Sequence, residues 1–169
     1  MSGDGVVVEV SNRQRRLQPG AAWVRRLVRD ACAAIGIEEA EISVVLVGDA
    51  AMAELNEEWL QHEGPTDVIT FGLSESTDEV EAWPGGLSGD IVVSTETACR
   101  LAAELGWSAE NELAYYIVHG LLHLAGFDDT TSPERAKMRR AERRVMQAVG
   151  LPAPPRRASR ARRPRSEHR

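Results

Sequence analysis

An apolar segment that ends in a glycine and two aspartates has residue types and a spacing that could bind a metal ion. His119 and His123 are four residues apart, so on a helix both imidazoles would project from one face and could reach the same ion. Gly126 could adopt the left-handed conformation that ends a helix, which would bring Asp128 or Asp129 back toward the imidazoles. Two nitrogens and one carboxylate oxygen leave the fourth zinc position open, as in catalytic sites. Spacing alone does not choose between the two aspartates.

The natural reaction of such a site is hydrolysis. Bound zinc lowers the pKa of a coordinated water to about 7 and polarises carbonyl or phosphoryl oxygens. In the HExxH motif of metallopeptidases, the residue after the first histidine is the glutamate that acts as general base, but here it is Gly120. A proton acceptor must therefore come from elsewhere, and the candidates are Asp90, Asp67, Glu112 and His62.

Composition indicates one domain and a separate C-terminal tail. A chain of 169 residues suits a single domain, which we expect at 1–150. Residues 151–169 are rich in Pro and Arg and offer no apolar face, so we expect a flexible tail there. The chain carries a net charge of −6 although the tail is strongly basic, so the domain itself is acidic and is not an obvious nucleic-acid binder. The tail could contact RNA.

Two features predict a cytoplasmic protein. The two cysteines show neither disulfide-framework nor CxxC spacing, which indicates reduced thiols. No segment approaches the roughly 18 consecutive apolar residues of a membrane span, so we expect no membrane association.

Hydrophobic periodicity predicts the elements that would position the histidines. Strands are expected at 6–10, 42–47, 67–71 and 90–94, the second buried on both faces and the last two paired as an antiparallel ribbon. Amphipathic helices are expected at 21–35, at 50–59 with Asp49 as its cap, and from Ser94 or Thr95 to Leu105. A further helix capped by Ser108 carries both histidines, and a capping box at Thr131–Glu134 opens the last helix, which extends to about Val149.

A group of polar residues surrounds the Gly-Pro turn that precedes the third strand. Their side chains could stabilise the turn through bonds to the backbone or could face a cleft. The group consists of Asn56, His62, Thr66 and Asp67.

Taken together, the blocks of sequence resemble the YbeY family, bacterial endoribonucleases implicated in ribosomal RNA maturation. The segment His119-Gly120-x-Leu122-His123-Leu124-x-Gly126-Phe127-Asp128-Asp129 is similar to the signature of that family. The other similar blocks are Leu55-Asn56, Pro65-Thr66-Asp67-Val68 with Phe71, and Gly89-Asp90-Ile91-Val92-Val93-Ser94, in the same order and at similar spacing. The resemblance covers roughly residues 6–149.

The resemblance implies a single α+β, zincin-like domain: a small mixed sheet of about four strands flanked by helices, with the HxxxH pair on a buried helix. It implies one Zn²⁺ ion held by His119, His123 and Asp129. From the residues themselves, we expect Asp128, Gly126 and Thr66 to be supporting or turn residues. It also implies cleavage of single-stranded RNA, with ribosomal RNA and the small ribosomal subunit as partners in maturation and quality control.

Two positions depart from the family pattern. The third ligand is usually histidine, whereas Asp129 adds negative charge and should weaken the Lewis acidity of the ion. The family usually has an arginine where this chain has Leu60, which cannot contact phosphate. Either His62, the arginines of the first helix or the Arg-rich tail supplies the cation, or activity is reduced. Two alternatives stay open. The histidine pair suggests a zincin-type metallopeptidase, which Gly120 disfavours, and Leu60 in place of arginine leaves room for a non-catalytic ribosome-associated protein with a structural metal.

Overall fold

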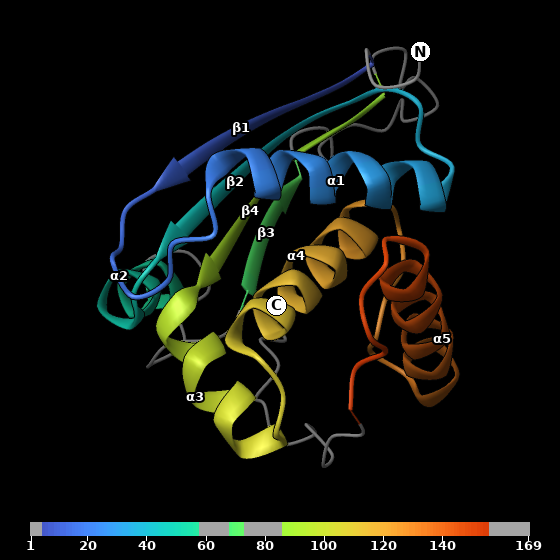
Figure 1. Ribbon diagram of the computed structural model, residues 1–169. Coiled ribbons are helices and arrows are strands. Elements are labelled where there is room, and N and C mark those ends of the chain that lie inside the picture. Colours follow the sequence, from blue (N-terminus) through green and yellow to red (C-terminus); the bar gives the residue numbers. More distant parts are fainter. Residues whose placement is uncertain (1–4, 58–67, 73–85, 156–169) are drawn as a thin grey trace.

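Four strands form one mixed sheet in the order β1-β2-β4-β3 (Figure 1). The computed structural model describes residues 5–57, 68–72 and 86–155. Strands β1 (Val6–Asn12), β2 (Ala40–Val47) and β4 (Leu87–Ser94) run parallel, and β3 (Val68–Gly72) pairs antiparallel with β4 at one edge. The predicted α+β class, the four strands and the antiparallel ribbon are confirmed.

The helices pack in unequal layers on the two faces of this sheet. A large core joins one face to α1 (Ala21–Ile35), α4 (Ala109–Leu124) and α5 (Ser132–Ala148). The other face carries α2 (Asp49–Leu55). Helix α3 (Thr95–Leu105) continues directly from β4 and contributes Ala98 to the large core. Only Val47, Met52, Ile69 and Val92 make up the small second core among the described residues. Strand β2, predicted to be buried on both faces, is fully covered on one face and partly covered on the other.

Glycines let α4 lie directly on β3 and β4. A Cβ atom built on Gly120 would stand 2.9 Å from Ile91 Cγ2 and 3.2 Å from Thr70 Cγ2, and one built on Gly89 would stand 2.8 Å from Leu124 Cδ2. Any side chain at these positions would push the helix away from the sheet. Ten residues of α4 are buried, which confirms the prediction that the two histidines belong to a buried helix.

Helix caps are formed largely as the sequence predicts. The side chains of Ser94, Ser108 and Thr131 accept hydrogen bonds from the backbone N–H three residues on, at the starts of α3, α4 and α5. Asp49 was predicted to cap the second helix, and this is wrong because Gly48 is the N-cap and Asp49 already lies in the first turn. The Asp49 carboxylate instead accepts hydrogen bonds from Ser94 Oγ and Thr97 Oγ1, across to α3.

Strand β4 begins at Leu87, three residues before its predicted start, because its early residues continue the parallel pairing with β2.

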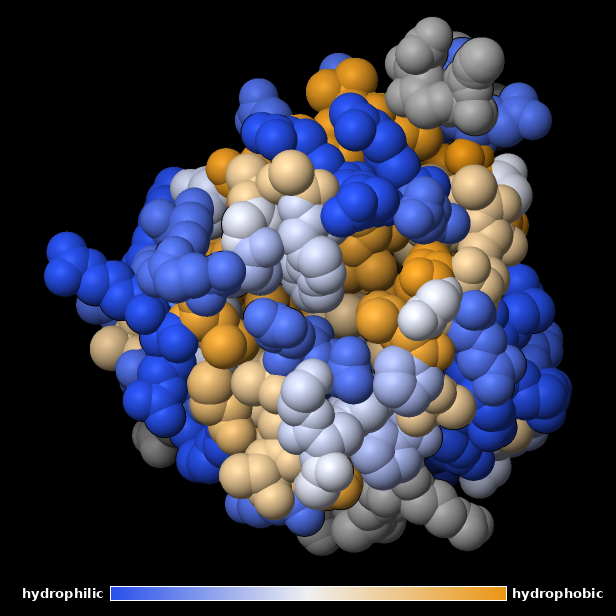
Figure 2. All heavy atoms as spheres, in the orientation of Figure 1, coloured by the Kyte–Doolittle hydropathy of each residue, from blue (hydrophilic) through white to orange (hydrophobic). Residues whose placement is uncertain are grey.

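Within the described part of the chain, no helix is long and apolar enough to cross a membrane. Figure 2 shows a surface on which hydrophilic side chains predominate, with smaller apolar areas between them.

Candidate metal centre

The C-terminal end of α4 turns the chain back toward its own histidines. Gly126 has a φ of 110°, and its N–H donates to His123 O at 3.0 Å. Phe127 N–H donates to Leu122 O at 3.0 Å. These two bonds form a Schellman motif, which needs a residue with positive φ and therefore favours glycine. The predicted role of Gly126 as the residue that ends this helix is confirmed.

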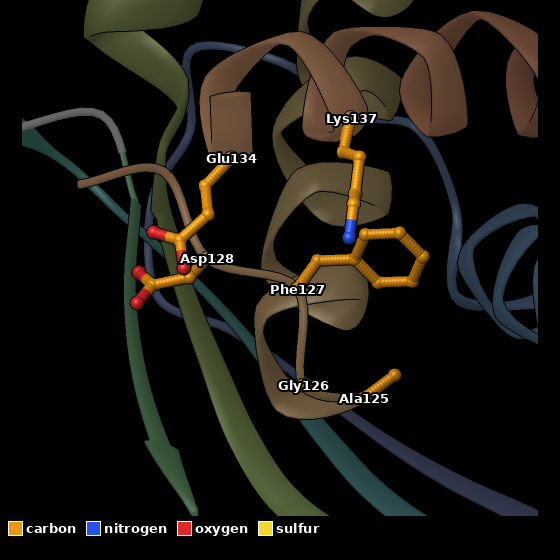
Figure 3. A pocket seen from close by; sticks show the side chains of 6 residues that line it. All are labelled: Ala125, Gly126, Phe127, Asp128, Glu134 and Lys137. Atoms are coloured by element: carbon orange, nitrogen blue, oxygen red, sulfur yellow. The ribbon is translucent and has the colours of Figure 1, made fainter. Parts of the chain in front are cut away.

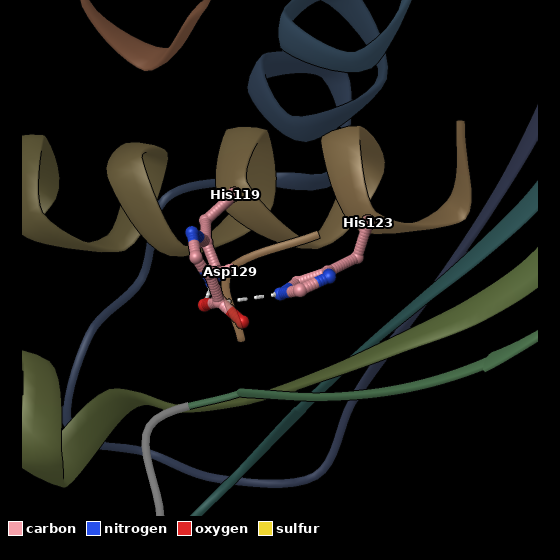
Figure 4. Close-up of side chains that lie close together, drawn as sticks. All are labelled: His119, His123 and Asp129. Carbon is pink, nitrogen blue, oxygen red and sulfur yellow. Dashed lines mark ion pairs between the residues drawn. The ribbon is translucent and has the colours of Figure 1, made fainter. Parts of the chain in front are cut away.

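Of the two aspartates after this turn, one bonds to the backbone and the other lies near the imidazoles. Asp128 is exposed, and its Oδ1 accepts a hydrogen bond of 2.8 Å from the N–H of Asp129. Asp128 thus stabilises the turn through its own side chain. Asp129 is half-buried, and its Oδ2 lies 3.8 Å from His119 Nε2 and 3.6 Å from His123 Nε2 (Figure 4).

Three potential ligand atoms converge at this point, one from each of His119, His123 and Asp129, all within 4.8 Å of one another. The two nitrogen–oxygen distances are too long for hydrogen bonds between these atoms. In a tetrahedral zinc site with bonds of about 2.1 Å, neighbouring ligand atoms stand roughly 3.4 Å apart. The donor set and its spacing therefore fit one divalent ion with an open position.

A buried carboxylate from α5 holds one of the imidazoles. Glu142 is only 4% exposed, and its Oε2 lies 2.6 Å from His119 Nδ1. Its Oε1 accepts a hydrogen bond of 3.2 Å from Tyr115 Oη. A carboxylate at Nδ1 fixes the proton on that nitrogen and leaves the Nε2 lone pair facing Asp129, which is the tautomer that a metal requires.

Glu142 was not among the predicted site residues, although the sequence contains a signal for it. It lies on the same face of α5 as the core residues Met138, Ala141 and Val145. A carboxylate in an apolar stripe needs a partner, because an unpaired buried charge is costly. The sequence does not identify that partner, since His119 is 23 residues away and reaches Glu142 only through the packing of α4 against α5.

The remaining predicted site residues are not gathered at this point. Gly89 and Ile91 face α4, so the alternation along β4 turns Asp90 to the opposite face of the sheet. Glu112 is fully buried and accepts a hydrogen bond of 2.9 Å from Trp107 Nε1. As candidate bases, Asp90 therefore faces away from the histidines and Glu112 is held elsewhere.

Four other residues singled out in the sequence, Leu60, His62, Thr66 and Asp67, lie outside the described residues.

A shallow hollow adjoins the turn that follows α4. It is lined by Ala125, Gly126, Phe127, Asp128, Glu134 and Lys137 (Figure 3). Figure 3 shows the carboxylates of Asp128 and Glu134 close together, with the Lys137 side chain beside the ring of Phe127. The hollow lies next to the metal-binding group and includes none of its three residues.

Comparisons with known proteins find one matching family model, similar sequences and a similar structure. Residues 9–150 match the family model described as Endoribonuclease YbeY. A protein named Endoribonuclease YbeY from Moorella thermoacetica is 43% identical over 76% of this chain and 85% of its own length. One of the same name from Micrococcus luteus is 38% identical over 88% of this chain and 96% of its own. The solution structure of TM1509 from Thermotoga maritima superposes with a TM-score of 0.56 at 24% identity, over 83% of this chain and 90% of that one, which shows a shared fold.

Proposed function

The chain belongs to the endoribonuclease YbeY family, and on that premise we propose that it is a zinc-dependent, single-strand-specific endoribonuclease that matures ribosomal RNA in the cytoplasm. Membership rests on the match over residues 9–150 and on relatives of similar length. The observation that supports the proposed chemistry is the convergence of His119, His123 and Asp129, in which the His119 ring is bonded to Glu142.

The residues of the site would divide the work as follows. His119 and His123 would hold a zinc ion through Nε2, and Asp129 would complete the set through a carboxylate oxygen. Such an ion supplies Lewis acidity toward a phosphoryl oxygen and a bound water of lowered pKa. Glu142 would keep the His119 ring in the required tautomer and orientation. Asp129 would reduce the positive charge at the centre compared with a third histidine.

Access to the site is consistent with a large substrate. The side chains of His123 and Asp129 are 28% and 35% exposed, whereas that of His119 is 16% exposed. The centre is therefore fixed on its inner side by Glu142 and open on the side of His123 and Asp129. Asp67 and His62 stay our candidates for the proton acceptor, and the small ribosomal subunit is our proposed partner.

The metallopeptidase alternative meets a second obstacle at Gly120. The HExxH mechanism needs a glutamate there, but the Cβ direction of Gly120 leads into Ile91 and Thr70. A glutamate at this position would clash with these two side chains of the sheet, so it could not be accommodated without moving α4. The geometry thus favours a nuclease over a zincin-type peptidase.

The test is to incubate zinc-loaded protein with a single-stranded RNA and, separately, with an unfolded protein. We expect RNA cleavage that is lost in His119→Ala and kept in Asp128→Ala, which changes a neighbouring carboxylate outside the metal-binding group. All three proteins must be purified identically, because contaminating ribonuclease would cleave in every sample. Cleavage of only the protein substrate would instead support a peptidase. No cleavage together with normal ribosome binding would support the non-catalytic alternative.

A further inference from the structure

Helix α5 has a highly basic outward face. Between positions 135 and 144 the sequence places six cations and one acid, Glu142. The acid is buried and bonded to His119 and Tyr115, so it contributes nothing to the outward charge of the helix. The cations are all exposed, and they are Arg135, Lys137, Arg139, Arg140, Arg143 and Arg144.

This charge is not neutralised within the described part of the molecule. None of the six cations forms an ion pair with a described carboxylate, in contrast to Arg100, which lies 2.8 Å from Asp49. Arg135 and Arg144 bond to backbone or hydroxyl oxygens, which leaves their charge uncompensated. Figure 2 shows strongly hydrophilic side chains over α5, at the right of the view.

The basic face begins beside the metal-binding group. Arg135 Nη1 donates to Thr130 O at 3.4 Å, one residue after Asp129, and Nη2 donates to Ser132 Oγ at 3.2 Å. From there the helix rises about 1.5 Å per residue, so the cations from Arg135 to Arg144 span roughly 13 Å. A chain bound at His123 and Asp129 could continue along this face.

We propose that the outward face of α5 binds the phosphate backbone of the RNA that extends from the cleavage site. This inference rests on the proposed function, because it takes RNA as the substrate. Closely spaced arginines on an acidic protein fit a polyanion, and contacts to phosphates would hold RNA without reading its sequence.

A second group of arginines provides a matched control. Six arginines and no acid occur in residues 10–29, but they belong to the loop after β1 and to α1. Strand β1 is at the opposite edge of the sheet from β3, which packs against α4 near the histidines. Arg15, Arg16 and Arg26 are exposed, and their side chains contact no described residue by a hydrogen bond or an ion pair.

The experiment compares two triple variants with the same change in charge. One carries Arg139→Gln, Arg140→Gln and Arg143→Gln on α5, and the other carries Arg15→Gln, Arg16→Gln and Arg26→Gln. Glutamine keeps a helix propensity close to that of arginine, and thermal unfolding checks that both variants are folded. The dissociation constant for a single-stranded RNA of about 20 nucleotides is measured with chelator at several salt concentrations.

We expect the α5 variant to bind about tenfold or more weakly, with a salt slope reduced by about 2 from the loss of three phosphate contacts. The control variant should change much less, and lysines at the three α5 positions should restore most of the binding. Equal weakening in both triple variants, or no weakening in the α5 variant, would overturn the proposal.

Cleavage of a dinucleotide, which is too short to reach along α5, separates this inference from the proposed function. The α5 variant should cleave it at the wild-type rate. If the wild-type protein and the α5 variant bind the longer RNA equally and both cleave it, the proposal that α5 binds RNA is wrong, whereas the proposed nuclease function is supported. If the wild-type protein neither binds nor cleaves RNA, both proposals fall.

Discussion

Two carboxylates in this protein have similar hydrogen-bond networks and different consequences. Asp49 accepts from Ser94 Oγ at 2.6 Å and Thr97 Oγ1 at 2.7 Å, and its Oδ2 pairs with Arg100 at 2.8 Å. Glu142 likewise uses both oxygens, one for a tyrosine and one for an imidazole. In both networks the carboxylate is satisfied within the protein.

The two networks differ in whether the last group can still bind a ligand. The Asp49 network closes on a guanidinium, which is always charged and has no acceptor to offer. The Glu142 network ends on His119, whose second nitrogen is directed at Asp129 and His123. The first carboxylate therefore has a structural role, whereas the second supports a candidate metal centre. The group at the far end of the network distinguishes the two.

Placing a glutamate at position 120 of α4 should produce the largest effect on stability, because its side chain would clash with the sheet. Gly120→Glu restores the HExxH pattern, but its side chain would meet Ile91 and Thr70. We expect a loss of about 3 to 5 kcal/mol in the free energy of unfolding and no peptidase activity. Urea denaturation measures the first and a casein assay the second. A stable variant that hydrolyses casein would show that position 120 faces the metal centre.

Removing the charge of Glu142 should weaken metal binding more than it weakens the fold. In Glu142→Gln the imidazole loses its anionic partner, and we expect zinc affinity to fall by about 10- to 100-fold. Competition with a chromogenic chelator gives the affinity. Tyr115→Phe is the control, since it removes only the other hydrogen bond to Glu142 and should cause a smaller loss. Unchanged affinity in the Glu142 variant would make this network purely structural, like that of Asp49.

Removing the charge of Asp49 should have the smallest effect, on stability alone. Burial raises the pKa of Asp49, but hydrogen bonds from Ser94, Thr97 and Arg100 outweigh it and hold the pKa below its usual range. The wild-type protein should therefore be more stable than Asp49→Asn by about 1 kcal/mol at neutral pH.

That advantage should be fully present above the unfolded pKa of about 3.9 and should disappear as the pH falls through the lower folded value. Denaturation at a series of pH values measures it, with zinc content as the control. A stability advantage that disappears between pH 7 and pH 5 would contradict this account. So would a lower zinc content in Asp49→Asn than in the wild-type protein at neutral pH.

Local patterns predicted local structure well. The histidine spacing, Gly126 and the serine and threonine caps each act within a few residues, and all were recognisable in the sequence. Features that depend on packing between distant segments could not be recognised in the sequence. The sequence predicts a cap at Asp49 because its true partners, Ser94 and Thr97, are more than 40 residues away. It does not identify Glu142 as a site residue because the partner of Glu142 is on another helix.

The choice between the two adjacent aspartates shows the same limit. Spacing left both open, and the turn after α4 places Asp129 with the imidazoles while Asp128 bonds to the backbone. Asp90 was a reasonable candidate base by residue type, but the register of β4 turns it to the other face of the sheet.

The most direct test of the central claim is the zinc content of two single variants, Asp129→Ala and Asp128→Ala, measured by mass spectrometry after identical dialysis. A metal centre formed by His119, His123 and Asp129 predicts about one zinc per chain in the Asp128 variant and a large loss in the Asp129 variant. Zinc that is undiminished in the Asp129 variant would contradict the assignment of this carboxylate as the third ligand.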